Sequence, residues 1–161
     1  MDRAAHAAAL LSDLAAHLEL DMLAFDEEGV CTLAFDQTLF VDVEYAESSE
    51  HLVLSTRLGP APAAHEAAVH RRLLLSNGLW RDRGAMFMAI EAETGAIVQV
   101  RPLVMQGLDF PTLRAALDGF VRTAAAWQEA LAALEQASPQ ASEQTADAML
   151  AHIAGQYVIR G

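Results

Sequence analysis

Lysine is absent from the chain, and cysteine occurs once in its 161 residues, at Cys31. A single cysteine excludes an internal disulfide framework and fits a reducing compartment. All 10 basic residues are arginine, against 22 acidic residues, which gives a formal charge of −12. Nucleic acid and anionic membranes need a cationic surface, so we expect neither as a partner. The charge fits a plain solvated surface, and it also fits a basic or neutral partner.

The chain also lacks a long apolar run, because no apolar stretch approaches the roughly 18–20 residues that cross a bilayer. The first twenty residues superficially resemble a signal peptide. However, Asp2, Asp13 and Glu19 interrupt them, and the apolar residues recur at helical spacing. We therefore expect a cytoplasmic protein. With 53% apolar residues, the chain has the length and composition of one domain with a buried core.

Apolar periodicity and turn residues predict an ordered series of elements. These are a helix over 2–19, strands over 30–35, 39–45 and 51–58, a helix over 64–76, a hairpin over 86–103 and a helix over 109–134. Short turns make the first three strands an antiparallel meander, which Gly59-Pro60-Ala61-Pro62 is expected to end. Asp109 is expected to cap the last helix. The order α-βββ-α-ββ-α predicts an α+β fold, with three helices flanking a largely antiparallel β-sheet.

The last 24 residues are predicted to lie outside the main domain, which covers 1–137. Residues 138–142 read Ser-Pro-Gln-Ala-Ser, the composition of a linker, and 145–158 carry the weak apolar pattern of a helix. We therefore expect 138–161 to be a linker followed by a helical tail. Truncation after Gln136 is expected to change the free energy of unfolding by no more than about 1 kcal/mol.

The histidines and the cysteine do not form a pattern typical of a metal or nucleophile site. His65 and His70 are five residues apart, which separates them by roughly 140° around a helix. His6 and His17 fall on one helical face, but no carboxylate or cysteine completes a metal site there. We expect surface or capping histidines. Cys31 lies mid-strand, where a small buried thiol is the usual role.

Carboxylates, arginines and glycines also fail to predict a reaction. Asp42 and Glu44 share one face of a strand, as on any solvent-facing strand surface. The cluster formed by Arg71, Arg72, Arg81 and Arg83 is expected to form salt bridges, within the chain or across a subunit interface. The glycines stand too far apart for a phosphate-binding loop. We predict no catalytic residue, no cofactor and no metal, and the chain is not expected to be an enzyme.

Two stretches of the sequence resemble the class I type III secretion chaperones, the family named for the Tir chaperone. LLLSNGLWRDRGAMFMAIEAETGAIVQVRPL, over 73–103, has a helix ending in leucines and asparagine, then a glycine, a strand, a Thr-Gly turn and a closing strand. EEGVCTLAFDQTLFVDVEY, over 27–45, and HLVLSTRLG, over 51–59, match the Gly-x-Cys-x-Leu, Asp-x-x-Leu and Leu-Gly landmarks. The closing helix, with its Leu…Phe…Trp, matches as well. The resemblance covers roughly 5–135, and the family usually ends near the third helix.

The resemblance implies a homodimer in the bacterial cytosol that binds the amino-terminal region of one or more secreted effectors. It implies that this region is kept extended and passed to the export apparatus, with the secretion ATPase as a further partner, and that the protein itself uses no nucleotide. In the family, the second helix and nearby strands form the dimer contact. Apolar surface on the first helix and the sheet takes the client.

These roles, with the apolar pattern, assign two sets of residues. The expected dimer contacts are Val69, Leu73, Leu74, Leu79 and Trp80. The expected client contacts are Leu10, Leu11, Leu14, Leu18, Leu39, Val41, Val43, Leu52, Leu54, Met86 and Met88. One long helix cannot cover all of this apolar surface, so we expect part of it to remain open as grooves, where methionine adapts to different side chains.

Two other functions stay open at this stage. One is a small-molecule-binding protein or enzyme, with a pocket between the sheet and the long helix. The other is an adaptor of related fold that binds folded proteins and has no role in secretion. Co-purification separates them, because a chaperone should retain an effector only while the effector's first ~100 residues are present.

Overall fold

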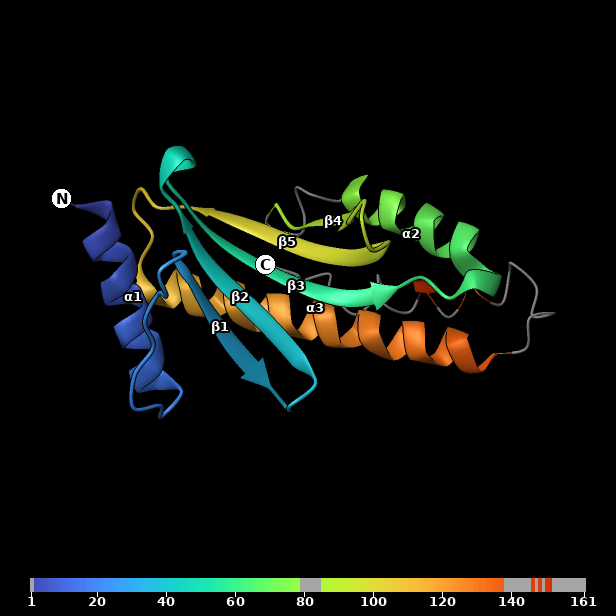
Figure 1. The fold of residues 1–161 in the computed structure, drawn as a ribbon, viewed down its shortest axis with the longest axis horizontal. Helices are drawn as coiled ribbons and strands as arrows, with labels where there is room; N and C mark the ends of the chain where they lie inside the picture. The colour runs from blue at the N-terminus through green and yellow to red at the C-terminus, as the bar shows by residue number, and fades with distance from the viewer. Residues whose placement is uncertain (1, 79–84, 138–145, 147, 149, 152–161) are drawn as a thin grey trace. The chain divides into compact units, whose positions relative to one another are not determined.

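The computed structural model describes residues 2–78, 85–137, 146, 148, 150 and 151. Its elements are α1 (Arg3–His17), β1 (Val30–Phe35), β2 (Leu39–Ala46), β3 (His51–Pro60), α2 (Glu66–Gly78), β4 (Phe87–Ile90), β5 (Ala96–Val104) and α3 (Phe110–Gln136). Short 3-10 turns precede β3 and α2. In the described residues, the strands form one sheet in the order β1-β2-β3-β5-β4 (Figure 1). The predicted α+β order is confirmed.

The chain divides into two compact units, which are described separately. Unit 1 comprises residues 1–56 and 101–121, and unit 2 comprises 57–100 and 122–161. Consequently β3, β5 and α3 each contribute one part to unit 1 and another to unit 2. Unit 1 contains the edge strand β1, and unit 2 contains the edge strand β4.

In unit 1, β1 pairs antiparallel with β2, and β2 pairs antiparallel with the first half of β3. The register between β1 and β2 runs from Val30↔Glu44 to Phe35↔Leu39. Successive side chains of a strand point to opposite faces. The expected alternation is confirmed, since Leu39, Val41 and Val43 are buried while Phe40 and Glu44 are exposed. Cys31 is buried on β1, as expected, and desolvation raises the pKa of its thiol.

Helix α1 begins at a capped amino terminus, where the Asp2 side chain accepts a hydrogen bond from Ala4 N–H. Its leucine stripe is buried in the core of unit 1. Two histidines join α1 to the start of α3: the His6 ring Nε2–H donates to Leu108 O at 2.8 Å, and the His17 ring packs edge-on against Phe110. These two histidines therefore help to fix α1 against the start of α3 and the turn before it.

In unit 2, α2 lies beside the edge strand β4 (Figure 1). The side-chain amide of Asn77 forms two hydrogen bonds with the backbone of Met88, as a neighbouring strand would. Its Nδ2 donates to Met88 O at 2.8 Å, and its Oδ1 accepts from Met88 N–H at 2.7 Å. Val69 and Leu73 are buried on the inner side of α2. The amide of Asn77 therefore fixes the end of the helix to the strand.

Helix α3 begins at Asp109, which accepts a hydrogen bond from Thr112 N–H at 2.9 Å, so the predicted cap is confirmed. Hydrogen bonds from Thr112 lower the pKa of the Asp109 carboxyl. The predicted apolar stripe is buried, with Leu113, Leu117 and Phe120 in unit 1 and Ala124, Trp127, Leu131 and Leu134 in unit 2. In unit 1, Arg101 on β5 donates to Ala116 O at 2.9 Å, and burial lowers the pKa of its guanidinium.

Two predicted details are wrong. β3 continues to Pro60 instead of stopping before Gly59. A proline in the last position of a strand removes a donor only where the ladder ends anyway, so it does not shorten the strand. We expected His65 to be a surface or capping histidine, but it is buried in the turn before α2. Apolar spacing alone does not show that this turn packs inward.

The described tail residues are helical, and two of them are buried. Ala146 and Leu150 are inaccessible, whereas Ala148 is exposed. A free tail would expose all three side chains, so we now expect truncation after Gln136 to destabilise unit 2. Met149 and Ile153 lie outside the described residues. The domain boundary at 137/138 stays a prediction.

We predict that Gly119→Ala stabilises the protein. A Cβ at Gly119 would lie 3.6 Å from Arg101 Nη1, an ordinary van der Waals contact. Alanine loses less conformational freedom than glycine in a helix, which predicts a gain of about 0.5–1 kcal/mol and a melting temperature about 1–4 °C higher. Gly107→Ala is the control, because its φ of +76° is strained for alanine and should lower the melting temperature. Calorimetry measures both, and a lower melting temperature for Gly119→Ala would contradict the prediction.

Candidate client and dimer surfaces

Most of the predicted client residues are buried in the protomer core. Ten of them are buried: Leu10, Leu11, Leu14, Leu39, Val41, Val43, Leu52, Leu54, Met86 and Met88. Leu18 is half-buried. The expectation that part of this set stays open is therefore wrong for these ten side chains, because the chain itself covers the inner face. Aspartate in place of Leu14, which is 1% exposed, is now expected to unfold the protein. Contact with a client stays a prediction.

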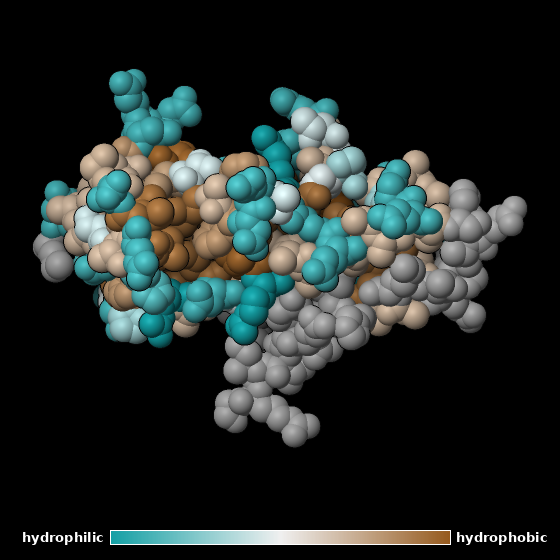
Figure 2. All heavy atoms as spheres, turned by 90° about the horizontal axis from the view of Figure 1, so that it is seen from below, coloured by the Kyte–Doolittle hydropathy of each residue, from teal (hydrophilic) through white to brown (hydrophobic). Residues whose placement is uncertain are grey.

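Unit 1 presents a different set of large apolar side chains to solvent. Leu20, Met22, Phe40 and Val104 are all more than 40% exposed, and Met22 reaches 77%. Figure 2 shows apolar atoms gathered over the end of unit 1 that carries α1 and the β1–β2 hairpin, with hydrophilic side chains around them. Apolar atoms gathered on one face are typical of a protein-docking surface.

Phe40 marks the outer face of the sheet in unit 1. It lies opposite Ala34, and the next outward pair is Thr32 with Asp42, whose side chains share a 2.6 Å hydrogen bond. This outer face is a short, mixed surface with one exposed aromatic ring among polar groups. The sequence also indicates this exposed ring, because Phe40 occupies an outward position of an alternating strand, where a polar residue is usual.

The predicted dimer residues divide between core and surface. Val69 and Leu73 are buried within the protomer, so they do not form an open surface of α2. Leu74 is 73% exposed, and Leu79 and Trp80 lie outside the described residues. α2 also exposes Leu75, and the adjacent β4 exposes Phe87 and Ile90. Phe87 and Ile90 are three positions apart and therefore point to opposite faces of β4. We use the name α2–β4 surface for the exposed apolar side chains of these two elements, Leu74, Leu75, Phe87 and Ile90.

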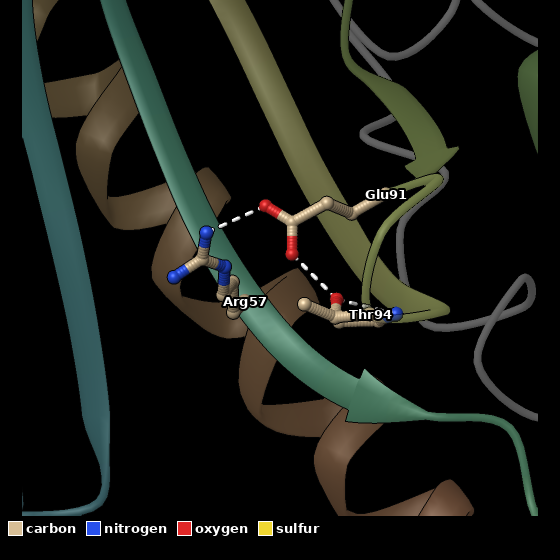
Figure 3. Close-up of polar contacts among 4 residues, drawn as sticks. Arg57, Glu91 and Thr94 are labelled. Atoms are coloured by element: carbon tan, nitrogen blue, oxygen red, sulfur yellow. Dashed lines mark hydrogen bonds and ion pairs between the residues drawn. The ribbon is translucent and has the colours of Figure 1, made fainter.

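Polar contacts fix the hairpin that carries β4. Figure 3 shows the Arg57 side chain on β3 reaching towards Glu91, just after β4, while Thr94 points to the same carboxylate from the turn. Arg57 Nη2 lies 2.5 Å from Glu91 Oε1, and the Thr94 hydroxyl donates to Oε2 at 2.5 Å. The Thr94 and Arg57 hydrogen bonds lower the pKa of Glu91. This network holds the hairpin turn against β3.

The described residues contain little that points to a reaction. No group of three or more histidine, cysteine or acidic side chains among them is placed to hold a metal.

A pocket of about 300 Å³ in unit 1 is lined by Arg3, His6, Met105 and the 106–108 turn. Two of its polar side chains are already engaged, since Arg3 pairs with Glu50 and His6 donates to Leu108 O. No helix of the described residues is long and apolar enough to cross a membrane.

Comparison with known families resolves what kind of protein carries these surfaces. The model of the Tir chaperone protein (CesT) family matches residues 9–128, most of the chain. The chain belongs to that family. It is thus a class I type III secretion chaperone, as the resemblance predicted, in a family of chaperones rather than enzymes. Comparison with curated protein sequences gave no match.

Solved structures support the same fold for the chaperone. A chain of the ExsC–ExsE complex matches with a TM-score of 0.72 and 24% identity, covering 88% of this chain and 100% of that one. A chain of the HopA1–SchA chaperone–effector complex gives 0.65 and 21%, covering 75% and 91%. The Yersinia pestis type III secretion chaperone SycH, in complex with a fragment of YscM2, gives 0.61 and 18%, covering 74% and 97%. At these identities, the matches support the fold alone.

We predict that Glu91→Gln reduces the loss of hairpin stability in acid. The pKa of Glu91 in the folded chain is below its ordinary value of 4.5. Its stabilising effect is therefore present above about pH 4.5 and is lost as the pH falls through the lowered pKa. The variant should start less stable at neutral pH and lose less towards pH 3. Amide exchange at Ala96, whose N–H donates to Thr94 Oγ1, reports on the turn. Glu93→Gln in the same turn is the control, and identical pH profiles for Glu91→Gln and the wild type would contradict the prediction.

Proposed function

We propose that this chaperone works as a homodimer in the bacterial cytosol and binds the amino-terminal region of one or more effectors, keeping it extended for export. The observation that carries the proposal is that the large exposed apolar side chains of the described residues fall into two groups. One group lies on unit 1, and the other is the α2–β4 surface of unit 2. Two docking tasks, self-association and client binding, account for both. A role for the secretion ATPase stays a prediction without assigned residues.

The α2–β4 surface suits self-association. It combines the outward side of a helix with an adjacent edge strand, and the Asn77–Met88 hydrogen bonds hold the two rigidly together. A rigid surface loses little conformational entropy on binding. A two-fold dimer uses the same patch on both subunits, so one such surface per chain is sufficient.

The unit 1 surface suits an extended client. Phe40 and Met22 offer an aromatic ring and a flexible thioether chain to the side chains of a bound peptide. β1 is an edge strand, and an added peptide strand gains affinity from main-chain hydrogen bonds at such an edge. Neither contact depends on one particular side chain of the client, because the first binds apolar side chains in general and the second binds main chain. This suits the binding of an unfolded segment.

We predict that Leu74→Asp yields a folded monomer. Leu74 is 73% exposed, so the substitution leaves the protomer core intact, but a dimer would have to bury the new carboxylate without a partner. Light scattering at micromolar concentration should give twice the 17.3 kDa chain mass for the wild type and 17.3 kDa for the variant. A 17.3 kDa species for the wild type would refute the homodimer.

We predict the reciprocal result for Phe40→Asp. This variant should keep its dimer mass and melting temperature but bind a co-expressed candidate effector at least tenfold more weakly, because Phe40 lies on the outer face of unit 1. Leu74→Asp serves as the matched control, with the same introduced charge on the other surface. Equal effector binding by Phe40→Asp and the wild type would remove Phe40 from the client site. An effector still retained after deletion of its first ~100 residues would contradict amino-terminal recognition.

A further inference from the structure

The negative charge of the chain is concentrated in unit 1. Of the 22 acidic residues, 14 lie in its two segments, 1–56 and 101–121, together with 3 of the 10 arginines. Unit 1 therefore carries a formal charge of −11, and unit 2 carries −1. Two of the arginines in unit 1 are engaged there, since Arg3 pairs with Glu50 and Arg101 donates to Ala116 O. The field around unit 1 thus favours the approach of a cationic partner.

The outer face of the sheet in unit 1 combines apolar side chains with two carboxylates. The pairing of β1, β2 and β3 places its outward residues in three successive rows: Val30, Glu44 and Val53; Thr32, Asp42 and Ser55; and Ala34 with Phe40. None of the residues in these rows is basic. Asp42 and Glu44 occupy successive outward positions of β2, so about 6.6–6.8 Å separates their Cα atoms along the strand.

Neither carboxylate has a cationic partner among the described residues. One oxygen of Asp42 accepts the 2.6 Å hydrogen bond from the Thr32 hydroxyl, and the other has no partner within the described chain. Glu44 is exposed, and in the same described residues its side chain makes no hydrogen bond or ion pair. The next outward residue of β3, Arg57, belongs to unit 2 and is held by Glu91. Two like charges on one strand face repel each other, and a cation bound beside them offsets that repulsion.

The short side chains of β1 leave this face within reach of a chain added at the edge of the sheet. A client strand paired with β1 would lie two strand spacings, about 9–10 Å, from β2. The outward residues in between include Thr32 and Ala34, which are small. Long arginine or lysine side chains can extend over such residues, with their aliphatic stems on apolar surface and their charged heads free. The exposed ring of Phe40 provides that apolar surface, next to Asp42.

We propose that the outer face of unit 1, formed by Phe40, Asp42 and Glu44, selects a client segment that is extended and basic. Arginine or lysine at alternate positions of the segment pairs with the two carboxylates, because side chains on one face of an extended chain are two residues apart, as they are on β2. The proposal rests on the proposed function, since it takes unit 1 as the client-binding part. It adds the charge of the client and the spacing of its basic residues.

The test uses a labelled synthetic peptide of about ten residues, the upper length of an ordinary strand, in which valine alternates with arginine. A twin peptide carries glutamine in place of every arginine, and the full-length wild type and variants are the receptors. At 0.1 M salt, where charges interact over ~10 Å, the wild type should bind the arginine peptide about tenfold more tightly than its twin. The double variant Asp42→Asn/Glu44→Gln should reduce this preference to about twofold. At 1 M salt, where screening acts within ~3 Å, the wild type should lose the preference as well.

Asp13→Asn/Asp118→Asn is the matched control, because it removes the same charge from exposed helix positions of unit 1 and leaves the outer face of the sheet unchanged. This control should keep the preference of the wild type. Equal binding of the two peptides by the wild type, or binding of neither, would overturn the proposal. An equal loss of preference in both double variants would also overturn it, since the charge of unit 1 as a whole would then be responsible.

Glu44→Gln alone keeps the test open if the double variant fails to fold, with a smaller loss of preference in the same direction. Unfolding of this variant too would overturn the proposal, because the carboxylate would then serve the fold. No effector enters the assay. An effector that binds elsewhere, or not at all, would contradict the proposed function and leave the peptide preference intact, so the two failures are distinguishable.

Discussion

The inner face of the sheet is already filled by the protein's own chain, and this constraint decides where anything else binds. In unit 1, Val41, Val43 and Leu52 are fully buried, so no partner reaches them without unfolding the protomer. Binding is left to the outward positions of the strands, to the segment after α1 and to the open side of α2. Among the described residues those positions carry few large apolar side chains, and the proposed contacts use these.

The sequence predicted the elements well because strand and helix periodicities are local properties. The segment VCTLAF is β1 in full, and the leucines of α1 fall on one buried stripe, as their spacing indicated. Periodicity does not tell whether an apolar face meets its own chain or a partner. Leu14 and Leu74 are both leucines on amphipathic helices, yet one is 1% exposed and the other 73%. That difference depends on tertiary packing, and for this reason the residues predicted for the client site were mostly core.

The family resemblance identified the kind of protein where the residues alone could not. No reactive cluster was available to indicate a chemistry, and among the described residues the geometry supplies none. The polar groups that are well placed serve the architecture: Asn77 ties α2 to β4, Arg57 and Thr94 hold Glu91, and His6 ties α1 to the turn before α3. Polar side chains that fix elements in this way suit a protein that binds other chains.

Helix α2 carries two contacts of unit 2. Its open side carries Leu74 on the α2–β4 surface, and Arg72, two residues earlier, reaches the tail at Ala151. Residues two apart on a helix point in clearly different directions, so the proposed dimer contact and the Arg72–Ala151 hydrogen bond lie on different sides of α2.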